Sequence, residues 1–158
     1  MELVIFIGLQ GAGKTSFYRT RFAASHVLVS KDRLRNNRRP ARRQRRLIEE
    51  ALEAGRSLVV DNTNPTVQDR VELIELARFH GATVIGCYFE SRLEDCLERN
   101  RLRTGKERVP DVGLLTTAKK LTPPTYAEGF DQLYYVRLAG DQQFEVQEWT
   151  NAGHDETT

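Results

Sequence analysis

Short apolar runs alternate with segments of helical apolar spacing along most of this 158-residue chain. Each run is continuous and rich in β-branched residues, which is typical of strands buried on both faces of a sheet. We expect such strands at residues 3–7, 27–29, 57–61, 83–89 and 133–138. Because strands alternate with helices, the pattern predicts an α/β fold: a parallel sheet of about five strands with helices on both faces.

The segments between the runs predict helices at residues 15–22, 40–54, 65–80, 92–103 and 112–121. Pro40 and Pro65 suit the first position of their helices, and Ser91 is the expected cap of the fourth. We expect the buried sides of the third and fourth helices to include Phe79 and Leu102. In the second helix, Leu47, Ile48, Ala51 and Leu52 form an apolar stripe that excludes the neighbouring arginines.

The C-terminal end has a weaker pattern than the rest of the chain. Phe144, Val146 and Trp149 fall among polar residues, which predicts a small edge strand before a frayed end. We therefore expect one main α/β domain at residues 1–140 and a short, partly disordered C-terminal extension at residues 141–158.

Composition is that of a soluble globular protein, with 39% apolar and 29% charged residues. No apolar run is long enough to cross a membrane, and no basic segment precedes the first strand, so we expect neither a membrane span nor a signal peptide. Cys87 and Cys96 lack the spacing of a metal site, which indicates two buried free thiols in a reducing compartment. The expected location is the cytoplasm.

The net charge of +2 conceals an uneven distribution of arginine. Arginines concentrate between Arg33 and Arg46 and again between Arg92 and Arg108, whereas the C-terminal end is acidic. A locally basic surface suggests a polyanionic partner such as a nucleic acid. The alternative is a solvated helix face, which is what most charged runs are.

The first strand leads directly into a phosphate-binding loop (P-loop) of the form G-x-x-x-x-G-K-[ST]. Glycine lets the main chain approach the phosphates of ATP, and the following helix directs its positive end at them. Lys14 supplies a point charge to the same oxygens, and the Thr15 hydroxyl is a ligand for Mg²⁺. The expected nucleotide-binding residues are Gly8, Gly11, Ala12, Gly13, Lys14, Thr15 and Ser16.

Two aspartates follow strands and so belong at the ligand-binding edge of the sheet. Asp61, after the third strand, fits a Walker B carboxylate that assists Mg²⁺ binding. Asp32, after the second strand, has two interpretations: a base that accepts a proton from an incoming hydroxyl, or a helix-capping or turn residue.

A basic segment surrounds Thr104 and Gly105 after the fourth helix. Positive charge there would suit a lid over the phosphates, because phosphoryl transfer is stabilised mainly by positioned charge. An exposed loop is the alternative. The basic residues are Arg99, Arg101, Arg103, Lys106 and Arg108.

Taken together, these motifs resemble the 5'-kinase domain of polynucleotide kinases, particularly the kinase half of the polynucleotide kinase-phosphatases. The resemblance covers residues 3–138. It rests on the P-loop, Lys31-Asp32, Asp-Asn-Thr-Asn-Pro at 61–65, Arg-Asn-Arg-Leu-Arg at 99–103, and Pro-Thr-Tyr-Ala-Glu-Gly-Phe at 124–130. It does not extend to the phosphatase domain of that family, so we expect no 3'-end processing by these residues.

The resemblance implies an ATP- and Mg²⁺-dependent transfer of the γ-phosphate to a nucleic-acid 5'-hydroxyl end. Asp32 would be the general base, Arg35 would contact an acceptor phosphate, and Arg101 and Arg103 would close over the ATP phosphates. Two other functions share the P-loop: a kinase of a small hydroxyl metabolite, and an ATPase that binds RNA or protein under nucleotide control. A carboxylate at position 32 favours a kinase, because binding alone needs no base there.

Overall fold

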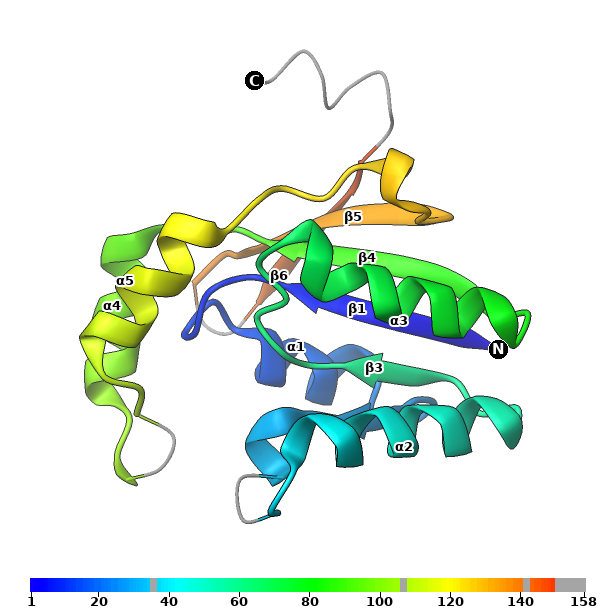
Figure 1. Ribbon diagram of the computed structural model, residues 1–158. Coiled ribbons are helices and arrows are strands. Elements are labelled where there is room, and N and C mark those ends of the chain that lie inside the picture. Colours follow the sequence, from blue (N-terminus) through cyan, green and yellow to red (C-terminus); the bar gives the residue numbers. More distant parts are fainter. Residues whose placement is uncertain (35–36, 106–107, 141–142, 150–158) are drawn as a thin grey trace.

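The computed structural model describes residues 1–34, 37–105, 108–140 and 143–149. Within these residues six strands form one sheet in the order β2-β3-β1-β4-β5-β6 (Figure 1). β1 to β5 pair in parallel, and β6 is antiparallel to β5 at the edge. The strands are β1 (Glu2–Ile7), β2 (Val27–Val29), β3 (Leu58–Val60), β4 (Thr83–Phe89), β5 (Gln132–Leu138) and β6 (Phe144–Trp149).

Helices cover both faces of the sheet. In Figure 1, α2 and α3 lie in front of the strands and α1 lies behind them, while α4 and α5 stand beyond the carboxyl end of β1. The helices are α1 (Lys14–Arg21), α2 (Pro40–Glu53), α3 (Val67–Phe79), α4 (Leu93–Leu102) and α5 (Asp111–Lys120), with 3₁₀ turns η1 (Lys31–Leu34) and η3 (Tyr126–Glu128). The α/β fold expected from the sequence, with a mostly parallel sheet between helices, is confirmed.

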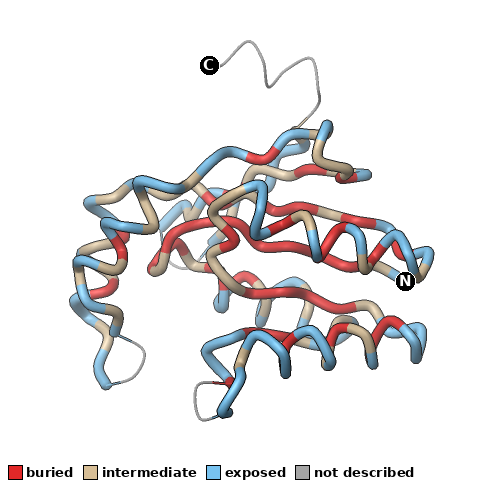
Figure 2. Tube along the Cα trace, in the orientation of Figure 1, coloured by how far each residue is buried: buried red, intermediate tan, exposed pale blue. Residues whose placement is uncertain are grey.

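β1 divides the core into two layers, because successive side chains of a strand point to opposite faces. Leu3, Ile5 and Ile7 pack with the inner sides of α2 and α3. Val4 and Phe6 pack with residues of α1, α4 and α5. Both faces of β1 are therefore buried, as the continuous run of buried residues in Figure 2 shows.

Several boundaries and orientations differ from the sequence prediction. α3 begins at Val67 rather than Pro65, because the Thr66 side chain accepts from the backbone N–H of Asp69 in a capping box. Phe79 and Leu102, expected to be buried, are 85% and 80% exposed, since each lies at the end of its helix, beyond the sheet-facing stripe. Ser91 does not cap α4.

The edge strand expected near the C-terminus is present as β6. Its Phe144 ring packs with the core layer that contains α1, at 5.1 Å between ring centroids from Phe17. Residues 144–149 of the expected extension thus continue the sheet of the main domain, and residues 150–158 lie outside the described part of the chain.

Two further expectations concern thiols and membranes. Cys87 and Cys96 are both buried and free, as the sequence predicted. Over the described residues, none of the helices has the length and apolar character needed to span a bilayer.

Candidate active site

A cavity of about 770 Å³ lies where the P-loop, η1 and the turn after β3 meet, and it extends between α2 and α3. These segments follow β1, β2 and β3, so the parallel sheet directs all three to one edge. The predicted site residues that line the cavity are Gly11, Lys14, Thr15, Asp32, Asp61 and Arg103.

The P-loop conformation depends on glycine where the backbone is tightly turned or closely packed. Gly11 and Gly13 have φ of 85° and 96°, a region that disfavours residues with a Cβ. A Cβ at Gly8 would lie 2.9 Å from Cβ of Phe89, so only glycine lets the loop start against β4. The Ser91 hydroxyl, expected as a helix cap, instead accepts from the Leu9 N–H at 3.0 Å and stabilises the loop.

Lys14 stands at the centre of the P-loop. Its Nζ donates to the carbonyl oxygens of Gly8 at 3.0 Å and Leu9 at 2.8 Å. Burial lowers the pKa of the Lys14 ammonium, and the negative charge of Asp61 opposes this effect. A phosphate would offer this buried cation stronger, charge-assisted acceptors than two neutral carbonyls.

Thr15 and Asp61 form a pair suited to a hard cation. Thr15 Oγ1 donates to Asp61 Oδ2 at 2.9 Å. Burial raises the pKa of the Asp61 carboxyl, and Lys14 and the Thr15 hydrogen bond act in the opposite direction. A hydroxyl and a carboxylate are oxygen donors that Mg²⁺ accepts, and this ion usually completes its shell with water and phosphate oxygens. Among the described residues no group of three or more His, Cys, Asp or Glu forms a metal site.

Asp32 lies in η1, directly after β2, and is exposed at the cavity. Its backbone N–H donates to Ser30 Oγ at 3.3 Å. The Asp32 charge acts on Lys14 and Asp61, which places all three groups within electrostatic range of one another. A carboxylate thus lines the same cavity as the P-loop lysine, as the base for a phosphate acceptor would have to.

The arginines expected in the lid separate in the structure. Arg103 lines the cavity and its charge acts on Lys14 and Asp61. Arg101 turns away and donates to Asp111 Oδ2 at 3.4 Å at the start of α5. Arg99 donates to the Gly11 carbonyl, an interaction with the P-loop that the sequence did not predict.

Other predicted residues lie around the cavity rather than in its wall. Gly8 and Ala12 are buried residues of the P-loop, and Gly13 precedes the first turn of α1. Ser16 is exposed, and its carbonyl accepts from Thr20. Arg35 lies outside the described residues.

Three buried polar residues were missed, although the sequence contains a signal for each. Each lies on the inward side of its helix, at a position that an apolar residue normally takes. Gln44 is four residues before Ile48, Arg70 is four residues before Ile74, and Asn100 is four residues after Cys96. The Asn100 side chain connects the end of α4 to the residue before Pro110, because it donates to the Val109 carbonyl at 2.5 Å and accepts from the Val109 N–H at 2.9 Å. A polar residue among the apolar residues on the buried side of a helix can therefore indicate a side chain that hydrogen-bonds the backbone of a neighbouring loop.

Arg70 is the largest of these and has no exposed surface. Its guanidinium binds both carboxylate oxygens of Glu128, at 2.8 and 3.1 Å, and donates to the Asn64 and Thr122 carbonyls at 3.0 and 3.1 Å. The turn after β3 is thus fixed to the segment that follows α5. The P-loop joins the same assembly, because the Gly8 N–H donates to the Thr63 carbonyl at 3.1 Å.

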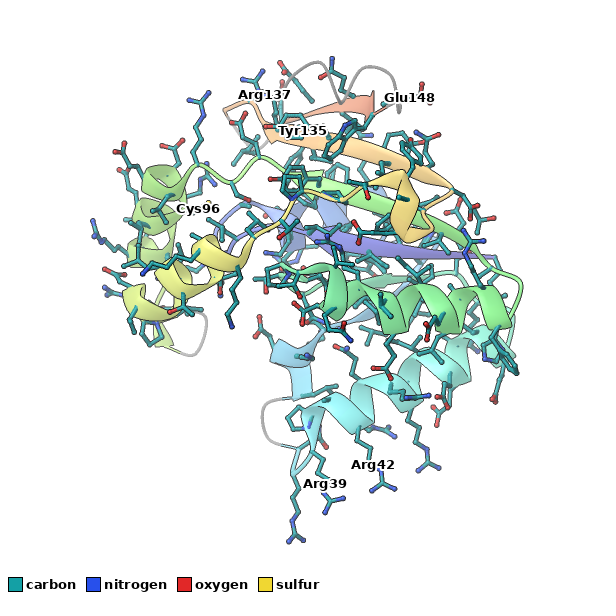
Figure 3. The ribbon with its side chains drawn as sticks, turned by 45° about the horizontal axis from the view of Figure 1, so that its top comes forward. Arg39, Arg42, Cys96, Tyr135, Arg137 and Glu148 are labelled. Carbon is teal, nitrogen blue, oxygen red and sulfur yellow. The ribbon has the colours of Figure 1, made fainter. Side chains whose placement is uncertain are left out.

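The first turns of α2 and the residues before it form a basic face. Its arginines line a shallow groove of about 310 Å³, and Arg42 also lines the main cavity. Figure 3 shows Arg39 and Arg42 pointing away from the body of the protein. Arg45 differs, because it pairs with Glu49 and with Glu72 of α3. The basic face consists of Arg38, Arg39, Arg42, Arg43 and Arg46.

Comparison with known proteins adds a family and a set of relatives. The family whose profile matches, described as an AAA domain, covers residues 3–124. A curated relative from Schizosaccharomyces pombe, the bifunctional polynucleotide phosphatase/kinase, is 25% identical over 141 residues, covering 85% of this chain and 33% of the relative. The chain thus spans about a third of that protein's length. This similarity confirms the resemblance to polynucleotide kinases inferred from the motifs.

Solved structures share the fold with proteins of different kinds. Chaetomium thermophilum Kti12 in complex with ADP-AlF3 has a TM-score of 0.64 at 16% identity, over 88% of this chain and 90% of that one. A sugar kinase from Janibacter sp. HTCC2649 has a TM-score of 0.62 at 15% identity, over 85% of each chain. At these identities the likeness shows the fold alone.

Proposed function

Because the chain belongs to the AAA domain family, by a match over residues 3–124, we propose that it is a P-loop kinase of nucleic-acid ends. It transfers the γ-phosphoryl group of ATP to a 5'-hydroxyl end, with Mg²⁺ as cofactor. The observation that carries this proposal is the single cavity that contains both the P-loop lysine and the carboxylate of Asp32. The relative named as a polynucleotide phosphatase/kinase supports the choice of acceptor.

The chemistry follows from the positions of the side chains. The acceptor oxygen bonds to the γ-phosphorus as its proton passes to the Asp32 carboxylate. The bond from the γ-phosphorus to the bridging oxygen breaks, and ADP leaves with the electron pair. Lys14 and Arg103 bring positive charge to the transferring group, which stabilises a loose transition state.

Thr15 and Asp61 would hold the Mg²⁺ ion. Bound there, the ion neutralises part of the charge on the phosphates. Lys14 is held by two P-loop carbonyls, so its ammonium is already oriented along the loop. We propose that Arg35 binds an acceptor phosphate, and that Arg101 joins the lid only by leaving Asp111.

The basic face is the proposed binding surface for acceptor phosphates beyond the 5' end. Arg42 is shared between the groove and the cavity, so the two surfaces are continuous. Pairing with acidic neighbours neutralises little of this charge, since the only ion pair described within the basic face joins Arg46 to Glu50 at 3.4 Å. A polynucleotide, which carries a phosphate at every residue, fits this arrangement.

One observation favours a metabolite acceptor instead. Between α2 and α3 the cavity is lined by Gln68, Asp69 and Glu72, and Glu72 accepts from Arg45 at 2.5 Å across the gap. Carboxylates and amides of this kind suit the hydroxyls of a small polar molecule. Under this second interpretation the basic face is only solvated.

Labelled ATP incubated with 5'-hydroxyl DNA, 5'-hydroxyl RNA, nucleosides and sugars separates these interpretations. We expect transfer to the oligonucleotides, and Asp32→Asn to lower kcat by about 10²–10⁴-fold while ATP affinity holds. Asp95→Asn, at an exposed carboxylate in the first turn of α4, is the matched control and should behave as the parent. Transfer to sugars alone would favour the metabolite kinase, and an active Asp32→Asn would exclude this base.

A further inference from the structure

Gln44 is a buried amide on the sheet-facing side of a helix whose other face carries the arginines. Its side chain is on the stripe of α2 with Ile48 and Ala51, and the residue is 8% exposed. Gln44 Oε1 accepts from Asn62 Nδ2 at 2.7 Å. Burying an amide costs free energy unless it is hydrogen-bonded, so this hydrogen bond fixes both side chains relative to each other.

Asn62 continues the connection to the segment that holds Asp32. Its Oδ1 accepts from the backbone N–H of Lys31 at 2.9 Å. The next N–H, that of Asp32, donates to Ser30 Oγ at 3.3 Å. Two side-chain oxygens thus fix the main chain at and immediately before the proposed base.

The Asn62 amide has a fixed backbone donor, the Lys31 N–H, on one side and the Gln44 side chain on the other. If the amide turned over, its NH₂ group would face the Lys31 N–H, and its oxygen would face Gln44 Oε1. Donor would then oppose donor and acceptor would oppose acceptor, so neither hydrogen bond could form. With the Gln44 carbonyl turned toward Asn62, both neighbours therefore favour the orientation in which Asn62 holds Lys31.

We propose that Gln44 and Asn62 are positioning residues for the base Asp32. They act through the backbone of Lys31 and form a chain of two hydrogen bonds, which we call the amide relay. The proposal rests on the proposed function, since it assumes that Asp32 accepts the acceptor's proton. The relay also joins α2 to η1, so the helix with the basic face and the base of the reaction keep one relative position.

The rate should be sensitive to this geometry. Proton transfer requires the carboxylate to be within hydrogen-bond reach of the acceptor hydroxyl, and a misplacement of about 1 Å can cost 10²-fold in rate. Loss of the relay leaves the P-loop intact, because Lys14 and Thr15 are held by other partners. The expected signature is a lower kcat for acceptor phosphorylation without a change in ATP binding.

Gln44→Met tests the relay, since methionine has a similar size and offers Asn62 only a weak thioether acceptor in place of the amide oxygen. We expect kcat to fall by roughly 10- to 100-fold, with the KM for ATP within about twofold of the parent. Gln44→Glu keeps an acceptor for Asn62 Nδ2 and should restore at least about a third of the parent kcat. Gln147→Met, at an exposed position on β6, is the matched control for the substitution itself.

A double-mutant cycle distinguishes a relay from independent structural effects. If Gln44 and Asn62 act as one unit, Gln44→Met and Asn62→Ala together should lower kcat no further than either alone. Asn62 is only partly buried, so Asn62→Ala carries the test if Gln44→Met does not fold at the assay temperature. Thermal unfolding shows whether each variant is folded at the assay temperature.

The outcomes separate this inference from the function on which it rests. A parent-like kcat for Gln44→Met, or no recovery in Gln44→Glu, overturns the relay but not the proposed function, provided that Asp32→Asn still lowers kcat by about 10²–10⁴-fold. If instead Asp32→Asn transfers phosphate like the parent, the proposed function fails and the relay fails with it. Equal losses of kcat and of ATP binding in Gln44→Met would indicate a general structural role and also overturn the proposal.

Discussion

The cavity has a nucleotide side, formed by the P-loop, and a proposed acceptor side, formed by η1, the turn after β3, α2 and α3. The two sides are built in different ways. On the nucleotide side the P-loop is a short local segment whose shape depends on Gly11 and Gly13, both at positive φ. On the acceptor side, hydrogen bonds and ion pairs between side chains fix segments that are distant in the sequence. Gln44 and Asn62 are 18 residues apart, and Arg70 and Glu128 are 58 apart.

This difference predicts how substitutions will affect each side. The backbone geometry of the P-loop tolerates few side chains at its glycines, but most of its phosphate-binding groups are backbone N–H groups, which substitutions other than proline leave in place. Acceptor-side geometry depends on individual polar atoms, and the loss of one leaves its partner unsatisfied in the interior. Single substitutions on the two sides should therefore change different properties, such as phosphate transfer on the nucleotide side and stability on the acceptor side.

The largest effect is expected at Lys14, the lysine of the P-loop on the nucleotide side. Lys14→Ala removes charge-assisted hydrogen bonds of about 1.5–3 kcal/mol each, so two bonds to phosphate correspond to roughly 10²–10⁴-fold in transfer. Phosphate transfer from labelled ATP measures this decrease for every acceptor. Lys119→Ala, on the exposed side of α5, is the control. Full activity of Lys14→Ala would show that this loop does not act on the phosphates.

The next effect is one of stability and concerns the acceptor side. Arg70→Met leaves Glu128, whose side chain is 5% exposed, without its cation and should lower the free energy of unfolding by about 3–5 kcal/mol. Arg70→Met with Glu128→Leu should recover part of this stability, because no buried charge then remains unpaired. Urea unfolding compares the three proteins. A decrease of less than about 1 kcal/mol in Arg70→Met would mean that other interactions hold the two segments together.

A smaller effect is expected where β6 supports the P-loop. The Phe144 ring lies 3.1 Å from the position a Cβ would take at Gly13, and it packs against Phe17. Phe144 is partly buried, so Phe144→Ala should cost about 1–3 kcal/mol of stability, less than a fully buried aromatic, and should weaken ATP binding. Val146→Ala, at an exposed position of the same strand, is the control. Unfolding and ATP titration together show whether the C-terminal strand contributes to the nucleotide side.

The smallest effect for each residue is expected on the basic face. Arg42, Arg43 and Arg46 replaced by Gln should flatten the dependence of oligonucleotide affinity on salt, by about 0.7–0.9 in log–log slope for each phosphate that is no longer neutralised. ATP affinity should change little, because these three arginines belong to α2 and, of the three, only Arg42 lines the cavity that contains the P-loop. Fluorescence anisotropy at several salt concentrations measures the slope. An unchanged slope would mean that the arginines of the basic face are solvated and do not bind phosphates, which would favour the metabolite acceptor.

Much of the site could be predicted from local sequence. The P-loop, the carboxylate after β3 and the carboxylate after β2 each follow a strand, and the parallel sheet brings the ends of those strands to one edge. The separation of Arg101 from Arg103 could not be predicted, because it depends on where Asp111 starts α5. The same holds for Ser91, which stabilises the P-loop rather than capping α4.

By itself the sequence determined the strands, the helices and the P-loop, since these depend on the spacing of apolar residues and on glycines within a few positions of one another. Only the tertiary structure decided which groups meet across the chain: Gln44 with Asn62, Arg70 with Glu128, and Phe144 with the P-loop. The reason is physical. A polar residue on the buried side of a helix indicates that it has a hydrogen-bonding partner. Which residue that partner is depends on segments that are distant in the sequence and meet only when the chain folds.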